Sequence, residues 1–411
     1  MTEYYDDLET RSADQREAAL FSTLPDLIAH AQAKASGWAK HLDGVDPKSV
    51  ADRAGLAKLP VFRKSMMGEL QKANPPFGGF ATIPVEDFTR IFMSPGPIWE
   101  PQRAGTDPWN GARPLFAAGF RKGDLVHNSL AYHMTPGGFI YDTAFLELGC
   151  TLFPAGIGNT EMQVAAISAL KPSGYAGTPD YLKVIMDHAS EAGLDISSLK
   201  RASVGGGALP ESLRAWYGEH GVAATQTYAT AELGVIAFET EALEGMVINE
   251  NYIVEIVKPG TGDLVVDSDV GEMVVTILDR TYPLIRFATG DLTAILPGDS
   301  PCGRTNMRIK GWMGRADQRT KVKGMFIDPA QINDIAKRHP EFSKLRLVVD
   351  RANDQDVMVL KAECANANDD MAEKLAASVQ AICKVRGDVE IVEIGSLPND
   401  GKVIADERSY E

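Results

Sequence analysis

The chain has 411 residues, with 41 Lys and Arg against 56 Asp and Glu, so its formal net charge at pH 7 is −15. This length exceeds one ordinary hydrophobic core and predicts two or three domains, and the anionic surface argues against nucleic acid and acidic membranes as partners. The four cysteines lie far apart, which argues against a disulfide scaffold or a zinc ribbon and is typical of a reducing, cytoplasmic compartment.

The first residues are acidic where a signal peptide would be basic, and no apolar run approaches the roughly 18 to 20 residues that span a bilayer. We therefore expect a soluble protein. Residues 11–80 predict helices separated by loops, with an acidic, Ala-rich helical run over 13–40.

Strand-like and helical patterns alternate between about residues 125 and 233. Short strands are predicted at 175–177 and 202–205, each followed by a helix, at 179–192 and 210–220. This alternation indicates an α/β sheet core whose strand-to-helix loops form the functional site.

After this region the sequence no longer alternates between strand and helix patterns. Short β-rich runs separated by Gly, Asp and Pro predict a smaller β subregion, with strands at 252–257, 264–266, 272–278 and 293–296. Beyond residue 314, strands at 345–349, 357–362 and 389–394 and a helix at 369–384 predict a small α/β domain of its own.

Five short segments carry polar or glycine-rich chemistry, and in chain order they are SVGGGALP (203–210), YATAE (228–232), RFATGD (286–291), GRAD (314–317) and LPNDGK (397–402). Glycines after a strand allow a phosphate or a flat ligand close to the backbone. Each segment alone also has an ordinary structural reading, because Thr-Gly-Asp is usually a turn and a lysine near a C-terminus is usually a surface residue.

In this order and spacing the segments resemble the adenylate-forming superfamily of acyl-CoA synthetases, adenylation domains and luciferases. The resemblance is closest to the short phenylacetate-CoA ligase branch and covers essentially the whole chain. It implies an α/β fold with a large N-terminal domain, residues 1–314, that includes the small β subregion. A small mobile C-terminal α/β domain, residues 315–411, would carry Lys402.

The resemblance also implies roles for individual residues. Tyr228 would stack on adenine, Asp291 and Arg315 would hold the ribose, and Glu232 would bind Mg²⁺. Asp317 would be the hinge, and Lys402 would stabilise the charge that develops as a carboxylate attacks the α-phosphate. The remaining nucleotide-binding positions implied are Gly206, Gly207, Ala208, Ala229, Thr230 and Lys323.

An acyl pocket is expected between the central strands. Its predicted lining is Tyr132, Gly137, Phe139 and Tyr141, and this aromatic character favours an aromatic or medium-sized apolar acid. His133 is a candidate gate or base, and a hydrogen-bonded structural histidine is an equally good interpretation.

The sequence departs from the family pattern where the triphosphate should bind. The family has a loop rich in Ser, Thr and Gly that ends in Lys-Pro, whereas this chain has IFMSPGPIWEP at 91–101. Pro95 and Pro97 lack N–H donors, Trp99 replaces a glycine and Glu100 replaces the lysine. A hydroxyl is also absent beside Glu232, although Thr230 is near. The outer phosphates of ATP are therefore expected to be held weakly.

Our leading interpretation is an enzyme that converts a small carboxylic acid to its CoA thioester through an acyl-adenylate, using ATP, Mg²⁺ and coenzyme A. The main alternative is an ATP-independent acyltransferase on the same fold, which moves an acyl group from CoA to a carrier-protein thiol or another nucleophile. A non-catalytic nucleotide- or acyl-CoA-binding subunit is a third reading. Retention of Lys402 argues against both alternatives. The related short ligases suggest a homodimer.

Overall fold

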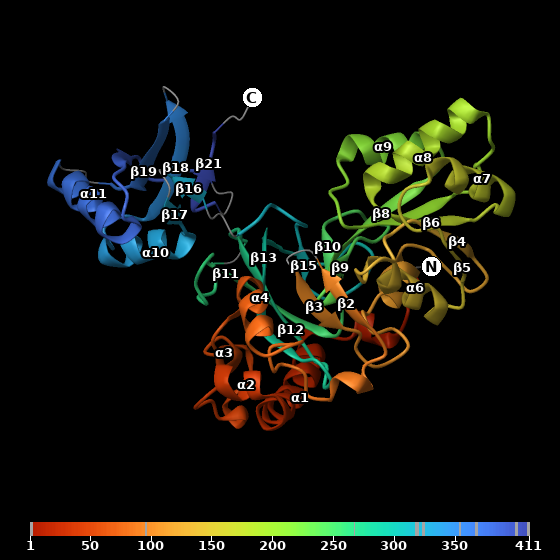
Figure 1. The fold of residues 1–411 in the computed structure, drawn as a ribbon, viewed down its shortest axis with the longest axis horizontal. Coiled ribbons are helices and arrows are strands. Elements are labelled where there is room, and N and C mark those ends of the chain that lie inside the picture. Colours follow the sequence, from red (N-terminus) through yellow and green to blue (C-terminus); the bar gives the residue numbers. More distant parts are fainter. Residues whose placement is uncertain are drawn as a thin grey trace. The chain divides into compact units, whose positions relative to one another are not determined.

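The structure is a computed structural model that describes residues 3–94, 97–266, 268–316, 320–322, 325–352, 355–365, 369–398 and 402–408 (Figure 1). The chain divides into two compact units. The first comprises Met1–Val254, Val275–Phe287 and Leu296–Trp312, and the second comprises Glu255–Val274, Ala288–Ile295 and Met313–Glu411. The last segment begins next to the boundary predicted at 314, and the second unit also contains two stretches from the middle of the chain.

Helices dominate the first 75 residues, as predicted. They are α1 (Ala13–Lys34), α2 (Ser36–His41), α3 (Arg53–Leu56) and α4 (Lys64–Ala73), with the short strand β1 (Phe62–Arg63) before α4. A capping box between Ser12 and Gln15 begins α1 by satisfying backbone N–H groups that have no partner within the helix. The single helical run predicted over 13–40 is wrong in one detail, because Ala35 has an extended backbone that separates α1 from α2.

A nine-stranded sheet forms the centre of the first unit, in the order β14-β15-β10-β9-β8-β7-β6-β4-β5. Strands β5, β4, β6, β7 and β8 pair in parallel, and helices connect them in the alternation that the sequence predicted. The parallel strands are β4 (Leu125–Asn128), β5 (Thr151–Pro154), β6 (Gly174–Gly177), β7 (Arg201–Val204) and β8 (Ala223–Thr230). The connecting helices are α6 (Gly137–Glu147), α7 (Thr160–Leu170), α8 (Pro179–Ala192) and α9 (Glu211–Glu219), and α5 (Ala112–Ala117) precedes β4.

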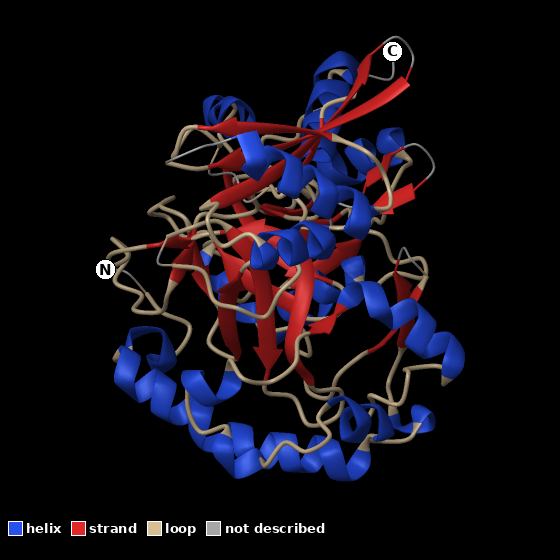
Figure 2. Ribbon diagram, turned by 90° about the vertical axis from the view of Figure 1, so that its left-hand side faces the viewer, coloured by secondary structure: helices blue, strands red, loops and turns tan. Residues whose placement is uncertain are grey.

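The other half of this sheet contains antiparallel pairs. These strands are β9 (Gly234–Phe238), β10 (Met246–Ile248), β14 (Ile295–Leu296) and β15 (Arg308–Ile309), and β9 pairs antiparallel with both β8 and β10. Helices α7, α8 and α9 share one hydrophobic cluster with the parallel strands and helices α5 and α6 share another, so they bury the apolar side chains of this sheet. Figure 2 distinguishes helices from strands by colour. Of the helices in the described part of the chain, none combines the length and the apolar character needed to cross a membrane.

Two smaller sheets come from the N-terminal and middle parts of the chain. One has the order β1-β13-β12-β11, with β11 (Tyr252–Val257), β12 (Gly271–Ile277) and β13 (Leu284–Thr293). The strand predicted at 264–266 is wrong, because only Leu264 forms a bridge, to Val257, and the side chains of Leu264 and Val266 are exposed. The other sheet is the antiparallel pair β2 (Ile91–Ser94) and β3 (Ile98–Pro101).

The C-terminal part has its own hydrophobic core, as predicted. Its four-stranded sheet has the order β20-β19-β18-β21, and α10 and α11 supply apolar side chains to the same core. The elements are β16 (Thr320–Val322), β17 (Met325–Ile327), α10 (Pro329–Arg338), β18 (Lys344–Ala352), β19 (Gln355–Glu363), α11 (Asp369–Cys383), β20 (Asp388–Val392) and β21 (Ile404–Asp406).

Candidate active site

The glycine-rich segment 205–208 lies at the carboxyl end of β7. The register pairs Gly177 with Val204 and Val204 with Gln226, so the ends of β6, β7 and β8 meet at one edge of the sheet. In open α/β sheets, ligands bind at this edge. Gly206, Gly207 and Ala208 are exposed there, and Gly206 has a φ of 71°, which a side chain would disfavour.

The predicted adenine-binding segment forms the end of β8 and the turn into β9. Tyr228 is buried on β8, Ala229 and Thr230 complete the strand, and Glu232 lies in the turn. The Thr230 hydroxyl accepts a hydrogen bond from the Leu233 N–H at 3.2 Å and so helps to shape the turn. Glu232 is buried to 2 % exposure, which the sequence pattern did not indicate.

Glu232 shares its surroundings with Glu100, the residue that replaces the family's lysine. Both residues are 2 % exposed. Burial, followed by the charge of Glu232, raises the pKa of Glu100 to about 8. Glu100 therefore favours its protonated form near neutral pH, so less negative charge is present here than the sequence suggested.

Three other side chains hold this acidic pair. The Ser94 hydroxyl donates to Glu100 Oε1 at 2.5 Å, and Lys64 Nζ lies 2.6 Å from Glu232 Oε1. The Arg103 guanidinium donates to the Glu232 backbone carbonyl. Glu100 Oε2 and Glu232 Oε2 have no hydrogen-bond partner among the described residues.

The oxygen donors of this pair suit a divalent cation. Mg²⁺ prefers hard oxygen ligands, uses one or two carboxylates and retains several waters. Within the described ranges, no group of three or more His, Cys, Asp or Glu side chains is arranged to hold a metal ion. The unpartnered Oε2 of Glu232 fits this ion, whereas Glu100 would have to lose its proton before it could serve as a second ligand.

The segment expected to bind the triphosphate is a hairpin of β2 and β3. The Gln71 side chain on α4 bonds both the N–H and the carbonyl of Trp99, each at 2.8 Å, and so attaches β3 to the helix. Because side chains alternate along a strand, Glu100 points inward while the Trp99 side chain is exposed. Pro95 and Gly96, which lie between the two strands in the sequence, are outside the described residues.

The ribose-binding pair predicted from the sequence comes together in the second unit. Arg315 Nη1 lies 3.1 Å from Asp291 Oδ1, and backbone pairing between the two residues aligns their segments. Gly290 has a φ of 78°, and a Cβ there would lie 2.8 Å from Arg315 Nη2, so glycine allows the guanidinium to approach. Asp291 is largely buried, which supports a positioned carboxylate rather than a solvated loop acid.

Of the remaining predicted residues of the second unit, the structure describes Lys402. Lys402 is exposed just before β21, and its backbone carbonyl accepts a hydrogen bond from Arg346 at 3.3 Å. Asp317 and Lys323 lie outside the described residues, so their predicted hinge and nucleotide roles stay predictions.

The predicted acyl-pocket residues lie at or near the start of α6. Tyr132 accepts a hydrogen bond from the Asn128 amide at 2.8 Å, donates to Asp142 at 3.1 Å, and packs closely over Gly138. Phe139 contacts the rings of Tyr132 and Phe92, with centroids 5.2 and 5.3 Å away. Gly137 begins α6, Tyr141 lies one turn further along, and His133 is exposed in the preceding loop.

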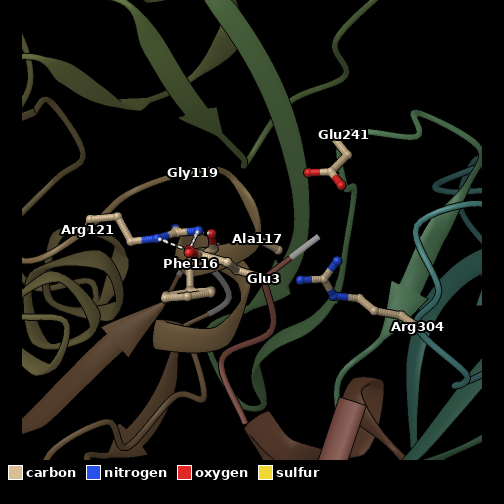
Figure 3. Close-up of a pocket in the computed structure, with 7 residues that line it drawn as sticks. All are labelled: Glu3, Phe116, Ala117, Gly119, Arg121, Glu241 and Arg304. Carbon is tan, nitrogen blue, oxygen red and sulfur yellow. Dashed lines mark hydrogen bonds and ion pairs between the residues drawn. The ribbon is translucent and has the colours of Figure 1, made fainter. Parts of the chain in front are cut away.

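A separate cavity of about 320 Å³ opens elsewhere in the first unit (Figure 3). Arg121 and Arg304 line it together with Glu3 and Glu241, and both arginines already have acidic partners, at 3.1 Å to Glu3 and 2.6 Å to Glu9. No residue proposed from the sequence lines this cavity.

Sequence reasoning missed Lys64, Arg103 and the burial of Glu100. Lys64 follows a Leu-Pro pair and a short strand, and nothing in that local pattern distinguishes it from a surface lysine. The only available signal was the substitution at position 100, since a carboxylate in place of a lysine implies a changed partner elsewhere in the fold.

Comparison with known proteins identifies relatives over most of the chain. The AMP-binding enzyme family matches residues 117–276, and the AMP-binding enzyme C-terminal domain matches residues 324–408. The chain is 32% identical over 374 residues to the phenylacetate-coenzyme A ligase of Aromatoleum evansii, covering 87% of this chain and 83% of that protein. It is 28% identical to the phenylacetate-coenzyme A ligase of Escherichia coli strain K12, covering 97% and 95%.

Among solved structures, an open conformation of 2-hydroxyisobutyryl-CoA ligase in complex with 2-HIB-AMP and CoA has a similar fold. The TM-score is 0.72 at 24% identity, over 95% of this chain and 91% of that one. The fold class predicted from the sequence is thereby confirmed. The chain belongs to the family of AMP-binding enzymes, with phenylacetate-coenzyme A ligases among its relatives.

Proposed function

We propose that this protein activates a carboxylic acid as an acyl-adenylate and passes the acyl group to coenzyme A. A carboxylate oxygen would attack the α-phosphorus of ATP and release pyrophosphate, and the thiol of CoA would then displace AMP from the acyl carbon. Similarity to phenylacetate-coenzyme A ligases over most of the chain supports this assignment. The observation that carries it is the pairing of Asp291 with Arg315, since a buried carboxylate and an adjacent guanidinium suit the hydroxyls of a ribose.

The chain's own residues have distinct tasks in this proposal. Tyr228 would contact the base, the exposed backbone at 206–208 would approach the acyl-phosphate region, and Lys402 would stabilise charge developing on the α-phosphate. Glu232 would hold Mg²⁺, with Glu100 as a second ligand once it has lost its proton, and the bound ion would neutralise phosphate charge. Because both carboxyl groups are buried, their positions are restrained before any ligand binds.

Replacement of Lys402 tests the adenylation step. With ATP, Mg²⁺ and a panel of carboxylic acids, pyrophosphate release by Lys402→Ala should fall by about 10² to 10³, the effect of removing one preorganised charge-stabilising group. Lys374→Ala is the matched control, because Lys374 is an exposed lysine of the same unit whose partner is Asp370 on the same helix. Unchanged pyrophosphate release in Lys402→Ala would contradict the role given to Lys402.

A second candidate function follows from Glu100. An acid replaces the lysine expected at the triphosphate loop, and an enzyme that transfers acyl groups from CoA to a carrier-protein thiol has no need of that loop. Lys402 is less readily explained by such a transferase. The assay that separates the two omits ATP and supplies acyl-CoA: transfer to a thiol without ATP, and no pyrophosphate release with it, would favour the transferase.

A further inference from the structure

The side chain of Tyr141 projects from α6 toward the carboxyl ends of β7 and β8. Its hydroxyl forms a hydrogen bond with the hydroxyl of Thr227 on β8. A Cβ at Gly205 would lie 2.8 Å from Tyr141 Oη and 2.9 Å from Thr227 Oγ1. The phenol therefore touches the first residue of the glycine-rich loop, at the sheet edge where the acyl group is expected.

The space around this ring is filled. The cavity there has about 160 Å³ of total empty volume, but no part of it admits a water-sized sphere. A single water needs about 10 to 15 Å³ of such space. Its lining residues are Gly111, Pro114, Leu115, Ile140, Tyr141, Ala144, Thr227 and Val235. A substrate ring cannot enter while Tyr141 keeps this position.

Packing and hydrogen bonding hold Tyr141 in place. The residue is 5 % exposed, and burial raises the pKa of its hydroxyl, so the group remains a neutral donor and acceptor. Helix α6, which carries Tyr141, packs closely against the backbone at Gly111, because a Cβ at Gly111 would lie 2.7 Å from the Ala144 side chain. Rotating the ring away would break the bond to Thr227 in a buried setting.

We infer that Tyr141 is a specificity-determining residue that closes the acyl pocket and restricts the substrate to a short aliphatic carboxylic acid. The inference rests on the proposed function, because it identifies the pocket as an acyl site. It differs from the aromatic acid expected from the sequence, which counted Tyr141 as lining for a ring-shaped ligand. In the fold, the tyrosine ring itself occupies the space that such a ligand would need.

The test compares propionate with phenylacetate in wild type, Tyr141→Ala and Tyr141→Phe. The measured quantity is kcat/KM for acid-dependent ATP–pyrophosphate exchange. Wild type and Tyr141→Phe should favour propionate by at least about 100-fold, since both retain the ring. Tyr141→Ala should raise kcat/KM for phenylacetate at least about tenfold, because an apolar cavity of ring size is opened. Leu146→Ala, an exposed position on the same helix, is the control and should match wild type.

Wild-type exchange with phenylacetate as efficient as with propionate would overturn the inference while leaving the ligase function standing, and this result does not depend on any variant folding. A second readout, the shift in Tm produced by phenylacetate, requires no catalysis. If no acid supports exchange but phenylacetate stabilises Tyr141→Ala and not wild type, Tyr141 closes the pocket and the ligase proposal fails. If phenylacetate stabilises both proteins equally, the inference about Tyr141 is wrong.

Discussion

The charge of the side chain at position 100 depends on where the fold places it. A glutamate in place of a phosphate-binding lysine suggests simple repulsion, but this carboxyl is buried beside Glu232 and receives a hydrogen bond from Ser94. Its pKa is raised from 4.5 to about 8, first by burial and then by Glu232. The side chain at this position therefore favours its protonated form near neutral pH.

Replacement of Glu100 should change the pH dependence of stability. The pKa of Glu100 is higher in the folded protein than in the unfolded chain. The stabilising contribution of its protonated side chain to the free energy of unfolding is therefore fully present below about pH 4.5 and is lost as the pH rises through about 8. Between these values, the free energy of unfolding of wild type should fall, relative to Glu100→Gln, by at most about 1.4 kcal/mol per pH unit. Urea unfolding at pH 5 to 9, in buffer without divalent ions, measures this difference.

The control for that experiment is Glu69→Gln, which removes an exposed carboxylate from α4 whose partner is Lys72. Its pH profile should run parallel to that of wild type. Parallel profiles for Glu100→Gln and wild type would show that Glu100 titrates alike in the folded and unfolded chains, contrary to our interpretation.

At the scale of elements, the turn between β8 and β9 positions Glu232. Gly234 begins β9 with a φ of 85°, and a Cβ there would lie 2.4 Å from the Trp109 carbonyl oxygen. The Val235 N–H donates to that same carbonyl at 2.9 Å, so the strand and the loop carrying Trp109 are joined through this contact. Glycine allows both the backbone conformation and the close approach.

Gly234→Ala should therefore destabilise the protein. The left-handed backbone alone costs about 1 to 2 kcal/mol for a residue with a side chain, and the contact with backbone atoms of Trp109 adds to it. Gly218→Ala is the matched control, because Gly218 lies in α9 with nothing near its Cβ position and should gain about 0.5 to 1 kcal/mol. Denaturant unfolding followed by tryptophan fluorescence measures both, and equal stability of the two variants would refute the argument.

At the scale of the whole molecule, the C-terminal part has the features of an independent folding unit. Its buried apolar core consists of residues between Val322 and Ile404, and β18, β19 and α11 form much of it. A core contained within one continuous stretch of chain can form without the rest of the protein.

A fragment of residues 313–411 should accordingly fold by itself. Thermal unfolding followed by far-UV circular dichroism should show one cooperative transition. Leu360→Ala, which truncates a fully buried side chain of β19, should lower the free energy of unfolding of this fragment by about 2 to 5 kcal/mol. A fragment with helical and strand signals but no cooperative transition would show that the remainder of the chain is required.

Much of the architecture was predictable from local patterns. The alternation that gives β6, α8, β7 and α9 follows from turn residues and apolar periodicity, and the five ordered motifs indicated the family. Asp291 and Arg315 were both predicted to hold a ribose, and in the structure they form an ion pair. Motifs of this kind are readable because each depends on residues that are neighbours in the chain.

Other decisive features depended on tertiary packing. Lys64 reaches Glu232, Glu100 turns inward from β3, and Tyr141 meets Thr227 and Gly205, and none of these contacts has a local signature. The sequence by itself determined the α/β fold class, because this follows from periodicity. It also indicated the candidate nucleotide-binding segments through their resemblance to a family, because each motif consists of residues that are neighbours in the chain. Only the tertiary structure decided which acids are buried together and how Tyr141 packs against Thr227, because burial and close contact arise between side chains that distant segments bring together.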